Sequence, residues 1–224
     1  MFEDVHSKIF IRVNNFLALV TIISVLSITL ESVKVLESYT YIFNLVEWIS
    51  VFFFTLEYIG RLIVSKKKLY YAGSFFGLID LISIVPTYFA LGNLTFLKTT
   101  RILRVLRFLK IIRVSKLSGG EPGREELGRL NFKIYAMSLI ASIVIFGSLI
   151  FIAEGHRPDF ANIPLGMIWA AKILLGGTPE VLSETIRGEL VTIAGRFTGL
   201  ILFGLLINVV GGAFNKLLFG SKKV

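Results

Sequence analysis

The sequence contains no cysteine, and this absence excludes a disulfide framework and catalysis by a thiol. Its two histidines, His6 and His156, are isolated and have no metal-ligand spacing around them. The glycine pair Gly176-Gly177 lacks the strand-to-helix context of a phosphate-binding loop. We therefore expect a protein that is not an enzyme and that has neither a cofactor nor a metal site.

Charged residues are scarce, at 17% of the 224 residues, whereas 54% are hydrophobic and the mean hydropathy is +0.77. Soluble domains of this length are usually less apolar, so the long apolar runs indicate an integral membrane protein. The first ten residues, MFEDVHSKIF, carry two acids and lack the basic-then-apolar pattern of a cleaved signal peptide. The net charge is +9, and the single segment 98–116 supplies seven of the cations. The excess of positive charge therefore does not by itself indicate a nucleic-acid partner.

The apolar runs predict six membrane helices, each near the length of about 20 residues that crosses hydrocarbon. They cover approximately residues 14–30, 41–64, 75–91, 98–116, 132–153 and 190–218, and we expect Pro86 to bend the third. Lysine and arginine are more frequent in the loops around 66–68 and 113–129 and at the end of the chain than in the opposite loops. This excess predicts a multi-pass protein of the cell membrane with both termini in the cytoplasm.

The composition changes in the segment LSGGEPGREELGRL, residues 117–130. Its glycines and Pro122 are expected to interrupt a helix. The sequence therefore predicts two modules, 1–116 and 130–224, joined by a linker at 117–129.

The fourth predicted span, KTTRILRVLRFLKIIRVSK, carries a cation at every third position between mostly apolar residues. A basic helix that lies on a membrane surface would instead collect its charges on one wide face. A period of three makes the cations spiral slowly around an α-helix, or form a straight stripe on a 3₁₀-helix. A helix of this kind presents its cations to fixed partners in succession as it slides.

The partners are acids inside the second and third spans, namely Glu47, Glu57 and Asp80. Ionisable groups within membrane spans are costly and normally paired. Glu47 and Glu57 are ten residues apart, about 15 Å along a helix, and Phe54 and Arg61 lie one turn to either side of Glu57. Taken singly, each acid is equally well explained by a structural ion pair. Together with the cationic span, they predict a path along which charge moves.

The segments FTLEYIGRLIVS, LIDLISIVP and RILRVLRFLKIIR closely resemble the second, third and fourth spans of voltage-gated cation channels, above all of the potassium branch. The resemblance implies that Phe54, Glu57 and Asp80 form the charge-transfer centre and that Glu47 is the outer acidic partner. The implied gating charges are Arg101, Arg104, Arg107, Lys110 and, at the inner end, Arg113.

The second half resembles the pore of archaeal voltage-gated potassium channels. The segment GELVTIAGRFTGLILFGLLINVVGGAFNKLLFG matches the inner pore helix, with Gly199 on the hinge glycine of that family. ANIPLGMIWAA resembles the start of the pore helix, with Pro164 and Trp169 matching, and Glu154 ends the fifth span where the family has a Glu. The resemblance implies an all-α membrane protein with a four-helix voltage-sensor domain, a two-helix pore domain with a re-entrant pore helix, and homotetrameric assembly among membrane lipids.

The selectivity filter departs from the family pattern. LLGGTPEVL stands where potassium channels have Thr-Val-Gly-Tyr-Gly-Asp, and it also resembles the weakly selective filter of cyclic-nucleotide-gated channels. The filter and pore-mouth residues implied by this alignment are Gly176, Gly177, Thr178, Pro179 and Glu180. Because Pro179 is locked near a φ of about −65° and no hydroxyl opens the segment, we expect the full set of carbonyl sites not to form. Glu180 is expected to attract cations at the mouth.

Lys172 lies in the expected pore helix, where the family has an apolar residue. We expect it to pair with Glu154 or with Glu180, or to extend its amine toward water near the helix end. The sequence leaves these alternatives open.

Together, the sequence and the resemblance predict a voltage-gated channel that passes monovalent cations with weak selectivity between potassium and sodium. The alternatives are a voltage sensor whose pore does not conduct, a potassium-selective channel with an atypical filter, and an anion path favoured by Lys172 and Arg196. After the sixth span only FGSKKV remains, so we do not expect control by a cyclic nucleotide within this chain.

Overall fold

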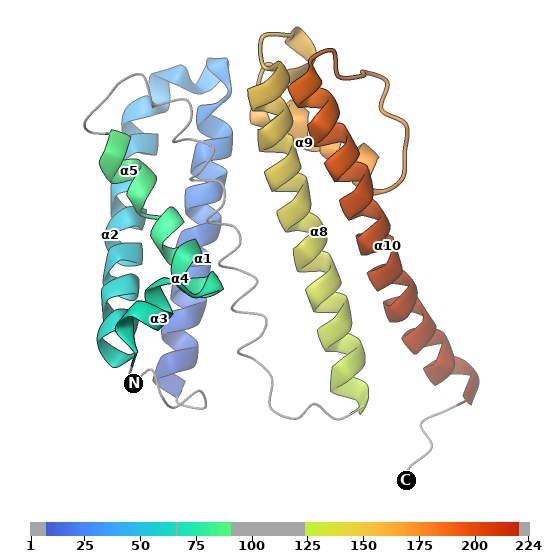
Figure 1. The fold of residues 1–224 in the computed structure, drawn as a ribbon, viewed down its shortest axis with the longest axis horizontal. Helices are drawn as coiled ribbons and strands as arrows, with labels where there is room; N and C mark the ends of the chain where they lie inside the picture. Colours follow the sequence, from blue (N-terminus) through green and yellow to red (C-terminus); the bar gives the residue numbers. More distant parts are fainter. Residues whose placement is uncertain (1–7, 66, 91–123, 220–224) are drawn as a thin grey trace.

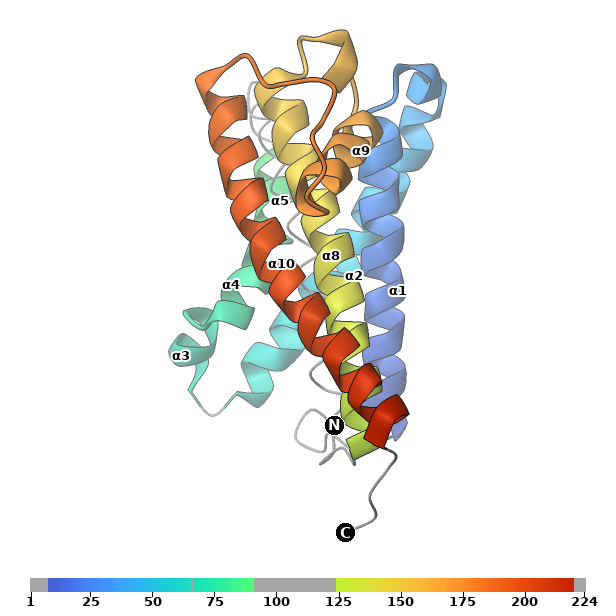
Figure 2. The same cartoon turned by 90° about the vertical axis from the view of Figure 1, so that its right-hand side faces the viewer.

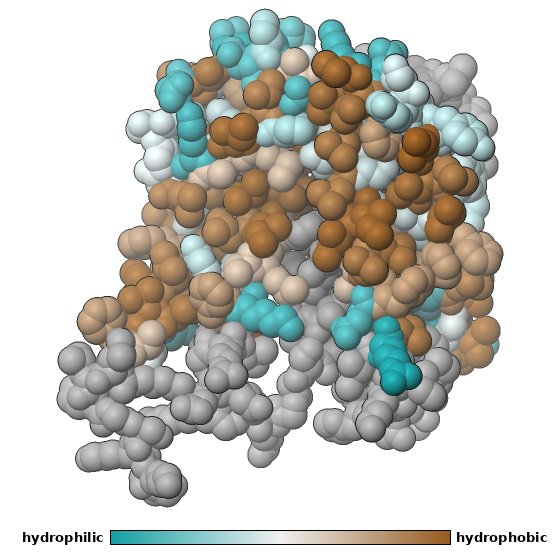
Figure 3. Space-filling view, turned by 180° about the vertical axis from the view of Figure 1, so that it is seen from behind, coloured by the Kyte–Doolittle hydropathy of each residue, from teal (hydrophilic) through white to brown (hydrophobic). Residues whose placement is uncertain are grey.

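The computed structural model describes residues 8–65, 67–90 and 124–219. All regular secondary structure in these ranges is helical, which confirms the all-α prediction (Figure 1). Within them, four helical segments are long and apolar enough to cross a membrane: Arg12–Glu31, Lys34–Val64, Phe132–Glu154 and Ile186–Phe214. A broad apolar band crosses the molecular surface, as expected where lipid chains surround the protein (Figure 3).

The first two spans form an antiparallel pair. Helix α1 (Lys8–Glu31) is connected to α2 (Thr40–Val64) through the short 3₁₀-helix η1 (Lys34–Tyr39), which lies at one end of the pair (Figure 1). Helix α1 contains the predicted span 14–30, and α2 contains the predicted span 41–64. Each helix extends slightly beyond its predicted span. The pairing follows from a stripe of buried residues along α2, whose opposite face is apolar and exposed.

The third predicted span is broken into two short helices. After α3 (Lys68–Ala72), the chain forms α4 (Phe75–Ile82) and then α5 (Val85–Ala90). Pro86 is the second residue of α5, and a proline ring clashes with the carbonyl four residues earlier, which here belongs to the last residue of α4. The predicted bend is therefore a break at residues 83–84, just before the proline.

The second half consists of two long helices and one short one. Helix α8 (Arg124–Glu154) is followed by the 3₁₀-helix η4 (Pro158–Phe160), by α9 (Ile163–Leu174) and by α10 (Ile186–Phe219). Helix α8 begins inside the segment 117–129 that we predicted as a linker. At 12 residues α9 is too short to cross a membrane. It runs inward beside α8 and α10, and the loop 175–185 returns to the end from which α9 started (Figure 2).

Two glycines allow α8 and α9 to cross closely. A Cβ on Gly147 would lie 2.6 Å from the backbone nitrogen and 2.7 Å from the Cα of Met167, and a Cβ on Gly166 would overlap the carbonyl oxygen of Gly147. Real Cβ atoms do not approach backbone atoms this closely, so both positions require a residue without a side chain. Small residues at helix crossings are typical of membrane proteins, where association depends on close van der Waals packing.

The two halves of the chain meet where α1 passes α8 and α9. Val25 and Ile28 of α1 pack with Ala141 and Val144 of α8 and with Ile163 at the start of α9. At the end of this contact, the Ser32 hydroxyl oxygen accepts a 2.9 Å hydrogen bond from the backbone amide of Ile163. The first amides of a helix have no hydrogen-bond partner within the helix. Ser32 supplies the acceptor for one of them from outside α9, as a capping residue would from the start of the helix itself.

We expect Gly147→Ala to destabilise the protein, because the methyl group must push α9 away from α8. Overpacking costs about 1–3 kcal/mol, and the better helix propensity of alanine, worth about 1 kcal/mol, recovers only part of it. The measurement is the melting temperature of detergent-purified protein. The matched control is Gly73→Ala, whose Cβ meets only the Leu69 carbonyl oxygen at 3.6 Å. Equal melting temperatures for the two variants would contradict the close crossing.

Candidate functional site

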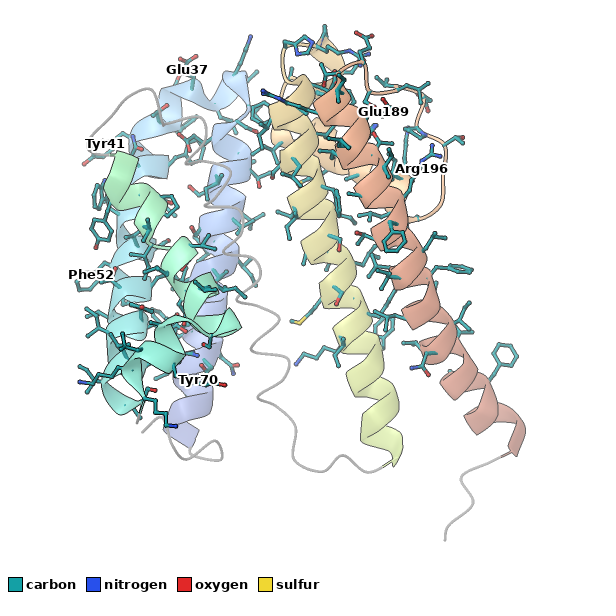
Figure 4. The ribbon with its side chains drawn as sticks, viewed as in Figure 1. Glu37, Tyr41, Phe52, Tyr70, Glu189 and Arg196 are labelled. Carbon is teal, nitrogen blue, oxygen red and sulfur yellow. The ribbon has the colours of Figure 1, made fainter. Side chains whose placement is uncertain are left out.

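One face of α2 carries the acids and the aromatic residue that the sequence singled out. Glu47, Phe54 and Glu57 are buried, at 6%, 0% and 7% exposure, and they fall on the same stripe of the helix. Tyr41 and Phe52 project from the other side, away from α1 (Figure 4). The sequence thus directs two carboxylates into the interior of a membrane protein, as predicted.

Glu47, the predicted outer acid, is connected to the third predicted span. Its Oε1 accepts a hydrogen bond from the hydroxyl of Thr87, which lies on α5 and is itself buried. Thr87 follows Pro86 directly, so the break before α5 also brings this hydroxyl to α2. The sequence analysis did not identify Thr87, because a threonine in an apolar run gives no signal of its partner.

Glu57 forms an ion pair within its own helix. The Arg61 guanidinium lies 2.6 Å from Glu57 Oε1, and the two side chains are 14% and 5% exposed. Arg61 also donates a 3.4 Å hydrogen bond to the amide oxygen of Asn14 on α1. A buried carboxylate is stable only with such partners, and removal of one member of a buried pair is strongly destabilising. The spacing of four residues predicted this neighbour.

Asp80 is fully buried on α4. Its Oδ2 accepts a 2.6 Å hydrogen bond from the hydroxyl of Tyr71 on α3, and its backbone carbonyl accepts one from the Ser83 hydroxyl at 2.6 Å. Tyr71 reaches Asp80 because the chain turns between α3 and α4, where the Ser74 hydroxyl caps α4 by accepting from the amide of Gly77. Tyr71 was missed by the sequence analysis.

Phe54 lies at the centre of a small apolar cluster with Val20, Val51 and Ile84. The cluster joins α1, α2 and the break in the third span, and it lies between Glu47 and Glu57 along α2. The described residues thus contain all four members of the predicted acidic and aromatic set. The predicted gating charges, Arg101, Arg104, Arg107, Lys110 and Arg113, lie outside the described residues, so their meeting with these acids stays a prediction.

The pore-like segment is built around α9. Asn162 caps the helix by accepting a 3.0 Å hydrogen bond from the amide of Leu165, and Pro164 occupies the first turn, where a missing N–H costs nothing. Helix α9 ends at Leu174, and Gly176, two residues later, has a φ of +80°. The amide of Gly177 donates to the carbonyl of Lys172 at 2.7 Å. A left-handed glycine is a common helix stop, and here it starts the predicted filter segment.

The loop after α9 is folded back against the helix by two side chains. The Trp169 indole donates to the Val181 carbonyl at 3.1 Å, and the Lys172 amine lies 3.0 Å from a Glu180 carboxylate oxygen. Of the two acidic partners that the sequence left open, Lys172 therefore takes Glu180. Pro179 is buried, whereas the other predicted filter residues are exposed in the single chain: Gly176, Gly177, Thr178 and Glu180.

Glu154, at the end of α8, holds the return of the loop to α10. It is fully buried, and its Oε1 accepts from the Glu184 amide at 3.0 Å, the Thr185 amide at 2.7 Å and the Thr185 hydroxyl at 2.7 Å. The Thr185 hydroxyl oxygen in turn accepts from the amide of Gly188 and so caps α10. A carboxylate at this place is also stabilised by the partial positive charge at the N-terminus of α10.

Arg157 ties the remaining acids of this end together. Its guanidinium lies 3.1 Å from Glu184, 3.6 Å from Glu154 and 3.7 Å from Asp159, and it donates a 2.7 Å hydrogen bond to the Leu182 carbonyl. The sequence analysis gave Arg157 no partner, because the acids that it meets are brought together by the fold.

Gly199, the predicted hinge, packs against the end of α9. A Cβ at this position would lie 2.7 Å from the carbonyl oxygen and 3.1 Å from the Cα of Leu174. The absence of a side chain therefore allows α10 to approach α9 closely. A hinge role for Gly199 stays a prediction.

Comparisons with known proteins agree with this geometry. The family model described as "Ion transport protein" matches residues 11–218. The chain is 30% identical to "Putative potassium channel protein RPA4233" of Rhodopseudomonas palustris, over 95% of the chain and 55% of that protein. It is 25% identical to the "Potassium voltage-gated channel protein Shal" of Drosophila melanogaster, over 81% of the chain and 33% of that protein. It is 26% identical to the human "Voltage-gated potassium channel regulatory subunit KCNG1", over 77% of the chain and 38% of that protein.

The chain thus spans about half, or less, of the length of these relatives. The family match, by contrast, covers nearly the whole chain. The chain therefore belongs to the ion transport protein family, as a multi-pass membrane protein that is distantly related to voltage-gated potassium channels and is not an enzyme.

Proposed function

We propose that the chain is the subunit of a homotetrameric voltage-gated channel that passes monovalent cations. Residues 1–116 act as the voltage sensor, residues 130–224 form one quarter of the pore, and both termini lie in the cytoplasm. The observation that carries the proposal is the burial of Glu47, Glu57 and Asp80 inside membrane helices. Ionisable groups inside membrane spans are normally paired, and Arg61 lies beside Glu57. In the proposed sensor, the cations of segment 98–116 pass these acids in succession.

The assembly of four copies follows from the shape of the pore half. One α9 and one loop cannot enclose an axial path. Helix α10 exposes a row of large apolar residues in the single chain, and Arg196 projects from the same helix away from α8 (Figure 4). An arginine in the middle of a span is costly against lipid, so this side of α10 faces protein or water in the assembly.

Weak selectivity between potassium and sodium follows from the loop after α9. Potassium filters replace the hydration shell of the ion with stacked rings of backbone carbonyls. Here Gly176 has the only positive φ among the described residues, and the buried Pro179 has a locked φ. A loop of this kind leaves ions with more of their water and so loses the contacts that reject sodium.

A voltage sensor with a non-conducting pore is the second candidate. It is favoured by the relative whose printed name describes a regulatory subunit, and by the large apolar side chain of Leu175, which is 63% exposed at the start of the loop. This candidate moves gating charge but passes no ions.

The sensor assignment predicts that Arg104→Gln together with Arg107→Gln makes the charge–voltage curve shallower. The membrane field is worth about 2.3 kcal/mol per charge per 100 mV, so three charges in each of four subunits give roughly 28 kcal/mol per 100 mV. The measurement is gating current in a planar bilayer. Lys133→Gln, which removes an exposed cation of α8, is the control and should leave the slope unchanged. An unchanged slope in the double variant would rule out these residues as gating charges.

The pore assignment predicts a reversal potential near zero with sodium outside and potassium inside. A value near the potassium equilibrium potential would instead indicate that the loop rebuilds potassium sites. A reversal set by chloride would indicate the anion path through Lys172 and Arg196. Gating charge without any ionic current would favour the non-conducting sensor.

We further propose that each sensor sits on the pore segment of its own chain. The support is the contact of Val25, Ile28 and Ser32 with α8 and α9 within one chain. The two modules then need not exchange between neighbouring subunits.

This arrangement is testable because the chain has no natural thiol. In a variant with both Ser32→Cys and Ile163→Cys, a short bis-maleimide should cross-link the two cysteines within a single chain. Peptide mass spectrometry should then detect the cross-link, and denaturing gels should still show monomers. Ser65→Cys paired with Ile163→Cys is the control and should not react across, because residue 65 follows the far end of α2. A ladder of cross-linked oligomers would show instead that the sensors are exchanged.

A further inference from the structure

We propose that Lys172 is a charge-balancing residue of the pore loop: it pairs with Glu180, and the pair, rather than Glu180 alone, sets the preference of the channel mouth for cations. This inference rests on the proposed conducting function and adds a residue that determines its charge selectivity. The pair joins the last turn of α9 to the middle of the loop, with 3.0 Å between the Lys172 amine and the Glu180 carboxylate.

The position of Lys172 on α9 suits a basic side chain. It lies in the last turn of α9, where the partial negative charge of the helix end favours a cation. Its own backbone carbonyl accepts the 2.7 Å hydrogen bond from Gly177 that closes the turn out of the helix. Lys172 thus contacts the loop through both its main chain and its side chain.

The loop around Glu180 is fixed on both sides. Pro179 before it is buried, and the carbonyl of Val181 after it is held by the Trp169 indole at 3.1 Å. The Glu180 side chain itself is 87% exposed, so its carboxylate lies at the surface of a constrained loop. A short, constrained connection lowers the conformational entropy that the ion pair loses on forming.

The Arg157 guanidinium, which also lies at this end of the chain, pairs with other acids. Arg157 lies close to Glu154, Asp159 and Glu184, and it also donates to a loop carbonyl. Lys172 and Glu180 form an ion pair with each other, in which their formal charges cancel. Four copies around an axis place four neutral pairs at the mouth instead of a ring of four negative charges.

The consequence for ion flow is direct. A ring of unbalanced carboxylates concentrates cations at a pore mouth, and salt screens this effect. A ring of balanced pairs does not. We therefore expect Lys172→Met to unmask Glu180 and raise the cation conductance about tenfold at low salt, the lower end of what focused charge produces, with little change at high salt.

The experiment compares four forms of the full chain in proteoliposomes and planar bilayers: the wild type, Lys172→Met, Glu180→Gln and the double variant Lys172→Met/Glu180→Gln. We expect higher low-salt conductance and stronger preference for cations over chloride in the first variant, and the opposite in Glu180→Gln, where the four amines are unmasked. The double variant should return close to the wild type, because it again has a neutral mouth.

A second measurement tests the pair without any current. Amine labelling of the purified protein, followed by peptide mass spectrometry, should modify Lys172 several-fold faster in Glu180→Gln than in the wild type, because the carboxylate no longer occupies the amine. Lys68, an exposed lysine of α3, is the internal control and should react equally in both proteins.

The two readouts separate the possible failures. Equal labelling of Lys172 in the wild type and Glu180→Gln would overturn the pair itself. Faster labelling together with unchanged conductance and charge selectivity in Lys172→Met would overturn its role at the mouth. If the wild type passes no ions while the labelling rates differ, the conducting function fails and the pair survives as a structural contact only, which also overturns the selectivity role.

Discussion

Hydrocarbon cannot hydrate a charged side chain, and the polar architecture of this protein follows from that constraint. Every acid that the described spans bury receives donors within the fold. Glu47 accepts from Thr87 of α5, Asp80 accepts from Tyr71 of α3, and Glu154 accepts from the backbone that leads into α10. In each case the donor belongs to a different element from the acid. The acids therefore link elements that are distant in the sequence, and they connect the broken third span to its neighbours and the loop 175–185 to the end of α8.

The proposed voltage sensor requires acids that stay in place while a cation moves past them. A helix whose cations recur every three residues can exchange partners only if those partners do not follow it. Glu47 and Asp80 accept hydrogen bonds from hydroxyls of α5 and α3, and these contacts hold the carboxylates in place. Glu57 differs, because Arg61 of the same helix already lies 2.6 Å away. All three acids are thus held in place within the described helices, as the proposed sensor requires.

The long helices were predictable from the sequence, because runs of about 20 apolar residues give a strong signal that local composition alone carries. The break before Pro86 was predictable in kind, though its position at residues 83–84 was not, since it depends on which carbonyl the ring excludes. The partners Tyr71 and Thr87 were not predictable, because a hydroxyl far along the chain reveals nothing of its tertiary contact. The choice of Glu180 over Glu154 by Lys172 depends on the turn at Gly176, a property of backbone geometry.

The short helix α9 is fixed at its start, its middle and its end. Ser32, just after α1, accepts from the first amide of α9; Gly147 of α8 allows close approach at the middle of α9, and Gly199 of α10 allows the same at its last turn. The loop that follows therefore starts from a point that three other helices define. The contacts that fix α9 at these three points come from residues outside the loop 175–185. The pair of Lys172 and Glu180 thus joins a helix that its neighbours hold in place to the loop that follows it, which is the geometry that the proposed charge-balancing role requires.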